Sequence, residues 1–416
     1  MQTHLAPEFK DTREGQAAEA ILRKCVHCGF CTATCPTYQL LGDELDGPRG
    51  RIYLIKQVLE GAPVTRKTQA HLDRCLTCRN CETTCPSGVQ YGHLVDIGRA
   101  IVEKKVERPA KEQAVRWMLR QGLTSPAFGP ALKLGQLARP LLPAALKAKV
   151  PGSAGTRARF WPTRTHKRKV LMLLGCVQPA MAPGINSATA RVLDAAGIQT
   201  LVADEAGCCG AIRTHLGDVD GGLADMRRNI DAWWPLVDGL TSEGTVEAIV
   251  MNASGCGVTV KDYGHALAHD PDYAEKARRV SALTRDLSEL LPDLVGALRP
   301  KLRKNRGGAQ RLAFHPPCTL QHGQQLRGGV EKHLGELGFE VKLAPADSHL
   351  CCGSAGTYSV LQPELATQLR DRKLTQLHAV EAPVIVSANM GCIQHLQGGT
   401  RTPVRHWVEV LDEALT

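Results

Sequence analysis

Two stretches decide the fold, Cys25-Val-His-Cys28-Gly-Phe-Cys31-Thr-Ala-Thr-Cys35-Pro36 and Cys75-Leu-Thr-Cys78-Arg-Asn-Cys81-Glu-Thr-Thr-Cys85-Pro86. Both follow C-x2-C-x2-C-x3-C-P, the ferredoxin pattern that ligates two [4Fe–4S] clusters. Three thiolates share one tight loop, while the fourth cysteine, expected to open a helix, reaches the other cluster. The predicted ligand sets are Cys25, Cys28, Cys31 and Cys85 for one cluster, and Cys75, Cys78, Cys81 and Cys35 for the other.

Zinc knuckles and a disulfide framework are the alternative interpretations of these cysteines. Zinc sites use pairs of C-x2-C rather than runs of four cysteines that end in proline. Residues 1–16 are polar and contain no apolar signal-peptide core, so we expect a cytoplasmic protein. Because the cytoplasm keeps thiols reduced, sixteen cysteines favour metal or redox chemistry over structural disulfides.

Composition excludes several other classes of protein. The 416 residues are 43% hydrophobic, which is enough for two or three packed domains and excludes general disorder. No run of eighteen apolar residues occurs, so no membrane-spanning helix is expected. The net charge of +10 is spread along the chain without a nucleic-acid motif, and we therefore expect no nucleic-acid partner.

The region around the two cysteine runs is predicted to be helical. Apolar residues between Asp46 and Glu60 recur at helical spacing, and Thr68–Arg74 leads into the second run. Residues 1–125 are therefore predicted to form an all-α, ferredoxin-like domain with two clusters. His27 and His93 lie near the runs, but eight thiolates already complete both clusters, so neither histidine is assigned a role.

Residues 126–169 contain proline, glycine, alanine and basic residues and are predicted to be a linker with some helix. Basic residues there accompany Leu134, Leu137, Leu141 and Leu142. A solvated charged face is the simpler interpretation, whereas the alternative is a patch that docks on a partner or on an anionic membrane surface.

The remaining eight cysteines form two copies of one pattern. Each copy has a single cysteine, a Cys-Cys-Gly sequence 32 or 33 residues later, and a final Gly-Cys. The two copies are Cys176, Cys208, Cys209 and Cys256, then Cys318, Cys351, Cys352 and Cys392. We expect one cysteine-rich unit at residues 170–298, a basic linker at 299–311 and a second unit at 312–416.

Each repeat is predicted to be an α/β unit, so the whole chain is of mixed, multidomain class. Apolar runs precede the single cysteines and are typical of buried parallel strands. Helical patterns and a further strand, Thr200–Ala203 or Val341–Ala344, lie before each double cysteine. The predicted strands that lead to the single cysteines are Val170–Leu174, Ala248–Met251, Leu312–Phe314 and Val384–Val386. The cysteines should gather at the carboxyl ends of these strands, where such sheets place ligands.

Four such thiols can bind a metal cluster, hold a substrate, or form a reducible disulfide within the vicinal pair. The sequence leaves these alternatives open, together with the number of further clusters, one or two. Packing as small apolar groups is the simplest alternative, but it does not explain a pattern that occurs twice.

Two ferredoxin runs followed by two Cys…Cys-Cys-Gly…Gly-Cys repeats resemble the iron–sulfur subunits of glycolate oxidase, anaerobic glycerol-3-phosphate dehydrogenase, lactate-utilisation proteins and heterodisulfide reductases. Within that group, residues 28–53 and 347–358 look like the bacterial glycolate oxidase iron–sulfur subunit. Heterodisulfide reductase repeats end in C-x2-C, whereas this chain has Ala253 and Asn389 at the earlier position. A five-cysteine, non-cubane cluster is therefore disfavoured, while a four-thiol cluster, or a site for quinone or a partner, stays open.

The resemblance implies an electron-transfer subunit of a glycolate dehydrogenase, peripheral on the cytoplasmic face of the inner membrane. FAD-containing partner subunits would oxidise glycolate to glyoxylate, and this chain would carry electrons toward quinone or another acceptor. The chain has no G-x-G-x-x-G fingerprint, so we expect no flavin of its own and no catalytic residue for substrate oxidation. The alternatives are the same role in lactate or glycerol-3-phosphate oxidation, or a thiol–disulfide reductase that uses the double cysteines.

Overall fold

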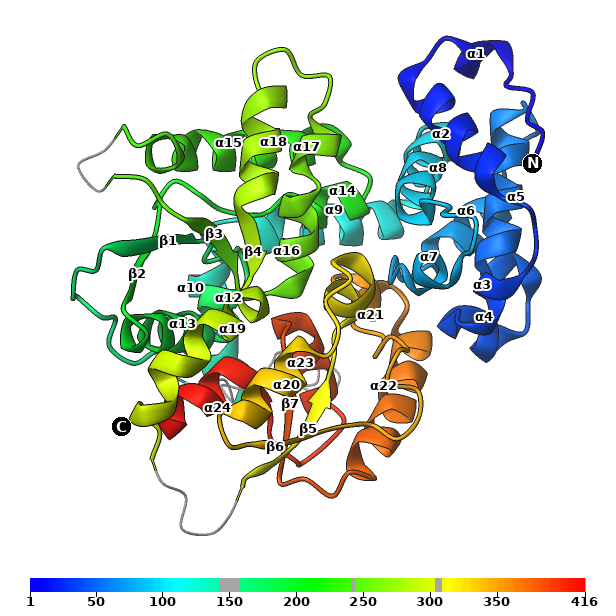
Figure 1. The fold of residues 1–416 in the computed structure, drawn as a ribbon. Helices are drawn as coiled ribbons and strands as arrows, with labels where there is room; N and C mark the ends of the chain where they lie inside the picture. Colours follow the sequence, from blue (N-terminus) through cyan, green and yellow to red (C-terminus); the bar gives the residue numbers. More distant parts are fainter. Residues whose placement is uncertain (142–156, 241–243, 304–308, 416) are drawn as a thin grey trace.

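The computed structural model describes residues 1–141, 157–240, 244–303 and 309–415. Helices α1–α8 form a compact module at the N-terminal end of the chain (Figure 1), which we call the ferredoxin module. Its elements are α1 (Pro7–Lys10), α2 (Arg13–Lys24), α3 (Phe30–Ala33), α4 (Pro36–Leu41), η1 (Glu44–Asp46), α5 (Pro48–Leu59), α6 (Arg66–Asp73), α7 (Asn80–Thr84) and α8 (Tyr91–Lys105).

Helix α5 forms the centre of this module, and the predicted helices between the cysteine runs are confirmed by α5 and α6. Pro48 stands in the first turn of α5, where its missing N–H has no intrahelical partner to lose. Ile52 and Ile55 are buried against α8. Gly98 of α8 permits this close approach, because a Cβ there would lie 2.6 Å from Cγ1 of Ile55.

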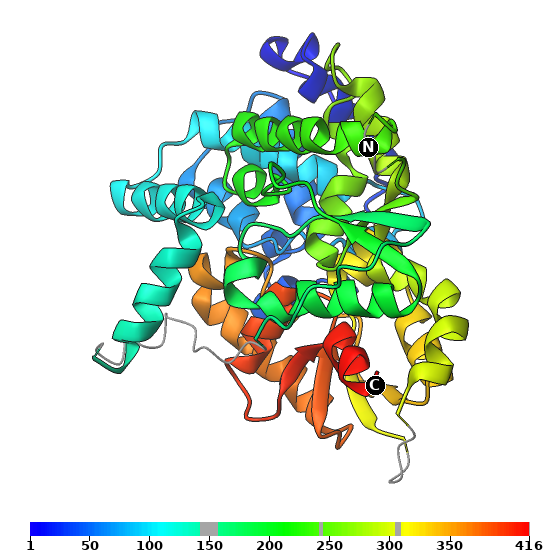
Figure 2. The same cartoon turned by 90° about the vertical axis from the view of Figure 1, so that its left-hand side faces the viewer.

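Helices α9 (Ala110–Thr124) and α10 (Phe128–Ala138) lead from the ferredoxin module to the repeats, followed by η2 (Arg139–Leu141). They lie at the edge of the molecule (Figure 2), and neither contains a fully buried residue. The predicted linker with some helix therefore contains α10. Leu142, one of the four leucines named in the predicted docking patch, lies outside the described residues.

Each repeat contains a four-stranded parallel sheet, and the strand orders, β2-β1-β3-β4 and β6-β5-β7-β8, are equivalent. The first repeat consists of β1 (Arg168–Met172), α12 (Gln178–Met181), α13 (Pro183–Ala195), β2 (Ile198–Leu201), α14 (Ala211–His215), α15 (Val219–Val237), β3 (Ala248–Met251), α16 (Ser254–Lys261), α17 (Tyr263–Ala266), α18 (Ala274–Leu283), β4 (Thr284–Asp286) and α19 (Leu287–Leu298), with η3 (Arg299–Lys301) after it. The second consists of β5 (Arg311–His315), η4 (Thr319–Gly323), α20 (Gly329–Glu336), β6 (Glu340–Leu343), α21 (Tyr358–Leu361), α22 (Pro363–His378), β7 (Val384–Ser387), α23 (Met390–Gln397), β8 (Val404–His406) and α24 (Trp407–Ala414).

The predicted α/β repeats are confirmed, with two differences. Strands β2 and β6 begin before the predicted Thr200 and Val341, directly after Gly197 and near Gly338, whose positive φ angles turn the chain into each strand. The fourth strands, β4 and β8, were not predicted, because three residues are too few to show a periodic pattern. Both are followed by a helix with a capping box, formed by Asp286 with Glu289 and by His406 with Glu409.

The two repeats pack on each other through equivalent helices. Helix α13 of the first repeat packs on α24 of the second, and α19 of the first packs on α20 of the second. One hydrophobic core extends through both repeats. A bidentate ion pair from Arg191 to Asp412, with N–O distances of 2.8 and 2.6 Å, joins α13 to α24. Among the described residues, no helix is long and apolar enough to cross a bilayer.

Candidate iron–sulfur and thiol sites

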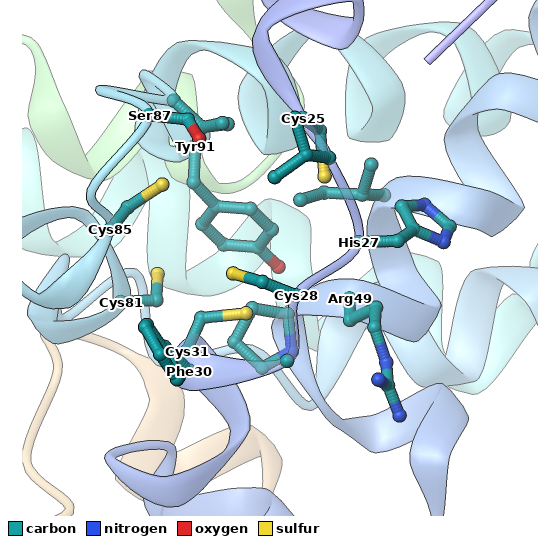
Figure 3. A pocket seen from close by; sticks show the side chains of 15 residues that line it. Cys25, His27, Cys28, Phe30, Cys31, Arg49, Cys81, Cys85, Ser87 and Tyr91 are labelled. Atoms are coloured by element: carbon teal, nitrogen blue, oxygen red, sulfur yellow. The ribbon is translucent and has the colours of Figure 1, made fainter.

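The first predicted ligand set surrounds one small cavity. The thiols of Cys25, Cys28, Cys31 and Cys85 line it, and so does Cys81 of the second set (Figure 3). Burial, followed by the neighbouring thiols, raises the pKa of Cys31 to about 11. Thiolates here are therefore unfavourable unless a cation or a cationic cluster neutralises them.

The second predicted set also comes together. Cys81 is buried, and the thiols that face it and raise its pKa, after burial itself, belong to Cys78, Cys75 and Cys35. The fourth cysteine of each run thus lies with the first three of the other run. Cys35 precedes α4, as expected, but the expectation that Cys85 opens a helix was wrong. Cys85 is the C-cap residue after α7, and a turn at Pro86 and Ser87 separates it from α8.

The two ligand loops share one strained backbone conformation. The residue before the second cysteine has a positive φ in both loops, 56° at His27 and 52° at Thr77, and the residue after it has 84° at Gly29 and 58° at Arg79. In the second loop, the Thr77 N–H donates to Cys75 Sγ at 3.4 Å. Three non-glycine residues in left-handed conformation indicate a loop shaped for a ligand rather than for its own stability.

A buried cation stands behind the second set. Arg51 is 1% exposed and bonds to Thr37 Oγ1 at 3.2 Å and to the His71 carbonyl oxygen at 2.8 Å. It also pairs with buried Asp46, which Arg74 and His71 contact as well. The Tyr91 hydroxyl donates to Cys75 Sγ at 3.5 Å. Charge and hydrogen bonds to sulfur are the features by which a protein sets the potential of a cluster.

The four cysteines of the first repeat form a connected group at the carboxyl ends of the strands. Cys176 interacts with Cys208, Cys208 with Cys209, and Cys209 with Cys256. Hydrogen bonds from Cys176 and Cys209, with one from the Gly210 N–H at 3.4 Å, lower the pKa of Cys208. Cys208 therefore carries negative charge more readily than Cys176 and Cys209, whose pKa values the same contacts raise.

The second repeat holds its cysteines in the same way. Cys318, Cys351, Cys352 and Cys392 interact in the same order, and the Gly353 N–H donates to Cys351 Sγ at 3.4 Å. Gly353 has a φ of 87°, and a Cβ there would lie 2.5 Å from the Ala366 carbonyl oxygen. The glycine of Cys-Cys-Gly is therefore required by both backbone conformation and space. At the position of the missing thiol, Asn389 donates from Nδ2 to Cys392 Sγ at 3.5 Å.

One cavity of about 2310 Å³ connects these sites. It lies between the ferredoxin module and both repeats, and all eight repeat cysteines line it together with Cys75 and Cys78. Cys78 packs against Cys318 of the second repeat. On the side of the first repeat, His93 of α8 bonds to Asp262 at 3.1 Å and stacks on His265 with ring centroids 4.0 Å apart.

In the described residues, the cysteines do not form a compact site for a single tetrahedral ion. All sixteen are free thiols. A tetrahedral zinc site with Zn–S bonds of about 2.3 Å needs thiols about 4 Å apart. In the described part of the chain, the one group of three donors within 4.8 Å of one another is Asp43, Asp46 and His71, which contains no cysteine.

Comparison with known proteins agrees with this geometry. Residues 21–89 match the 4Fe-4S dicluster domain, and residues 170–261 and 312–397 each match the cysteine-rich domain. The glycolate oxidase iron–sulfur subunit of Escherichia coli (strain K12) is 56% identical over 416 residues, which is 100% of this chain and 99% of that protein. The chain belongs to the family of glycolate oxidase iron–sulfur subunits. As a member, it is an electron-transfer subunit of an oxidoreductase and carries 4Fe–4S clusters.

Two further relatives extend the comparison. The probable glycolate oxidase iron–sulfur subunit of Bacillus subtilis (strain 168) is 30% identical and covers 94% of this chain, with 91% of its own length matched. Lactate utilization protein A of Geobacillus thermodenitrificans (strain NG80-2) is 26% identical and covers 59% of this chain, with 98% of its own length matched.

Several residues that shape these sites were not found from the sequence. Arg51 is hidden within a helical pattern, and nothing in its sequence context marks it as buried. The unassigned His93 proves to join the ferredoxin module to the first repeat, whereas His27 lies beside the first cavity near Arg49 (Figure 3). His315 and Lys373, both buried beside the second repeat's thiols, would have been found by aligning the repeats residue by residue.

Proposed function

We propose that this chain carries electrons from glycolate-oxidising flavin subunits toward a quinone through two [4Fe–4S] clusters. Cys25, Cys28, Cys31 and Cys85 would hold one cluster, and Cys75, Cys78, Cys81 and Cys35 the other. The observation that supports this proposal is the exchange of the fourth cysteines, because Cys85 lies near Cys25 and Cys31, whereas Cys35 lies near Cys78 and Cys81. Bound clusters supply one-electron steps, and the protein supplies the ligands, Arg51 and the hydrogen bonds to sulfur.

The packing of the modules favours a continuation of this path into the repeats. Cys78 contacts Cys318, so the second ligand set adjoins the four thiols of the second repeat. The repeats in turn meet where Ser254 Oγ bonds to Thr319 Oγ1 at 2.7 Å, two residues from Cys256 and one from Cys318. We propose that the four-thiol groups hold further iron–sulfur clusters, with the second repeat nearer to the ferredoxin module.

The assay uses the chain co-expressed with its flavin partners. Cys78→Ser should abolish glycolate-dependent dye reduction while flavin stays bound to its own subunit, and iron should fall by up to about four per chain. Full activity in this variant would contradict the electron path. The same assay with lactate and glycerol-3-phosphate tests the alternative substrates. The lactate utilization relatives make lactate the second candidate.

We also propose that α9 and α10 dock on an anionic membrane surface. Leu134 and Leu137 are 70% and 79% exposed, and Trp117 and Met118 of α9 are exposed as well. No acidic residue occurs between Glu112 and Asp194, while basic residues recur throughout that stretch. An apolar helix face flanked by cations is the pattern of peripheral, interfacial binding.

A further inference from the structure

The two repeats differ most where their cysteine sites should be alike. Their strands align without a gap from Val170 and Leu312 to Cys176 and Cys318, because these strands pair in the same register with the neighbouring strands. Position by position, buried Leu173 of the first repeat then corresponds to buried His315 of the second. Counting back from Cys256 and Cys392, Met251 corresponds to Ser387 in the same way.

A third difference lies on the helix that covers each site. The Cys-Cys-Gly glycine of the first repeat faces the Gly222 carbonyl oxygen, and that of the second faces the Ala366 carbonyl oxygen. Seven residues after these, α15 carries Asn229 and α22 carries Lys373. Asn229 bonds to the Cys208 carbonyl oxygen at 2.7 Å, whereas Lys373 is 2% exposed and donates to the Asp347 and Ser348 carbonyl oxygens.

The hydrogen bonds of His315 determine which ring nitrogen carries the proton. The Ser387 hydroxyl donates to the His315 carbonyl oxygen at 3.0 Å. Its oxygen is also 3.0 Å from Nδ1, and since its proton is already used, it accepts from Nδ1–H. Neutral His315 therefore has an unprotonated Nε2.

This Nε2 has no partner in the structure, although the side chain is only 1% exposed. His315 lines the cavity that Cys318, Cys351, Cys352 and Cys392 also line. A buried imidazole lone pair without a donor is uncommon unless a metal or a ligand completes it. Imidazole replaces thiolate as an iron ligand in some iron–sulfur centres, and no proton has to leave Nε2 before it binds.

We propose that the second repeat holds an iron–sulfur group with His315 Nε2 as a ligand in addition to the cysteines, whereas the first repeat uses cysteines alone. Ser387 fixes the imidazole through Nδ1, and the buried ammonium of Lys373 balances the negative charge of the thiolates. The first repeat, with leucine, methionine and asparagine at these positions, provides neither the nitrogen ligand nor the buried cation. The inference rests on the proposal above that the repeat thiols hold clusters.

The test uses the full chain, purified anaerobically from cells grown on ¹⁵N-labelled histidine. Iron is counted, and nitrogen coupling to the reduced centres is measured by pulsed EPR. We expect more than about eight irons per chain and one directly bonded ¹⁵N, since two ferredoxin clusters account for eight irons without nitrogen. His315→Leu, which copies Leu173, should remove the nitrogen signal and lower the reduction potential of one centre.

Ser387→Ala is a second variant, which serves if His315→Leu does not fold. It keeps the imidazole but removes the hydrogen bond to Nδ1, and it should weaken the ¹⁵N coupling. Leu173→Gln serves as the matched change in the first repeat and should leave the nitrogen signal intact. About eight irons with no bonded ¹⁵N, or an identical ¹⁵N signal in His315→Leu, would overturn this inference while the two-cluster path stands. Fewer than about eight irons would contradict the two-cluster path itself.

Discussion

The side chain of Cys78, in the second ferredoxin run, packs against that of Cys318, in the second repeat. Two neighbouring contacts brace this junction. Thr83 Oγ1 and His322 Nδ1 are 3.0 Å apart, and Asn80 Nδ2 donates to the carbonyl oxygens of Thr34 and His349 at 3.0 and 3.3 Å. Asn80 thus joins both ferredoxin loops to the second repeat, and these contacts fix Cys78 beside Cys318.

The first prediction concerns this junction. Cys318→Ser should remove the magnetic interaction between the cluster that we propose at Cys78 and the one that we propose in the second repeat, because it removes the repeat sulfur that contacts Cys78. Cys176→Ser, the same change at the equivalent position of the first repeat, should leave that interaction intact. EPR relaxation of the reduced ferredoxin centre measures both variants. Equal changes in relaxation in the two variants would contradict the closer contact of the ferredoxin module with the second repeat.

The second prediction concerns the Cys-Cys-Gly glycine. Gly353→Ala should destabilise the protein by about 3 kcal/mol, because the left-handed backbone and the contact with the Ala366 carbonyl oxygen both oppose a Cβ. Gly338→Ala is the matched control, since Gly338 has a φ of 94° but no atom within 4 Å of its Cβ position. It should cost only about 1 kcal/mol. Urea denaturation midpoints compare them, and equal losses would contradict the steric argument.

The repeats could be predicted from sequence because their signals are local. Buried strands appear as short apolar runs, and two copies of one cysteine pattern predict two α/β units of the same kind. Strands β4 and β8 escaped prediction individually, although Thr284-Arg-Asp-Leu-Ser-Glu and Val404-Arg-His-Trp-Val-Glu occupy equivalent places in the two repeats. The shared strand and capping box become visible only when these segments are aligned.

The junction between modules could not be predicted in this way. Cys78 and Cys318 are 240 residues apart, and their contact depends on how completed modules pack. The same holds for Arg51, which is buried only because Thr37, Asp46 and the His71 carbonyl oxygen surround it. Local sequence patterns do not show which distant residues will contact Cys78 or Arg51. The cysteine spacing, in contrast, does predict which cysteines come together in the ligand loops.

The third prediction concerns pH. The hydrogen bond to Asp262, outweighing burial, raises the pKa of His93. A raised folded-state pKa gives stabilisation that is fully present below the unfolded value of about 6.5 and is lost as pH rises through the folded value. His93→Gln should therefore lower the free energy of unfolding more at pH 6 than at pH 8.5, with a difference on the order of 1 kcal/mol. Urea denaturation at the two pH values measures this difference.

Three other groups face His93 and enter this balance. His265 stacks on its ring, and Arg79 and Glu82 add opposite charges. His378→Gln is the control, because His378 is exposed and the one hydrogen bond described for its ring is to the Thr400 hydroxyl. A pH-independent loss in His93→Gln would show that this residue acts by packing alone.

The fourth prediction concerns the exposed face of α10. Replacing Leu134 and Leu137 with glutamate should weaken binding to vesicles containing phosphatidylserine by at least about tenfold, because each leucine contributes about 1–2 kcal/mol when it leaves water. Leu240→Glu is the control, since Leu240 is 71% exposed but follows α15 instead. Vesicle sedimentation at low and high salt separates the electrostatic from the apolar contribution to binding, because salt screens the charges of the basic residues but does not weaken the burial of the leucines. Unchanged sedimentation of the double variant would show that α10 does not contact lipid.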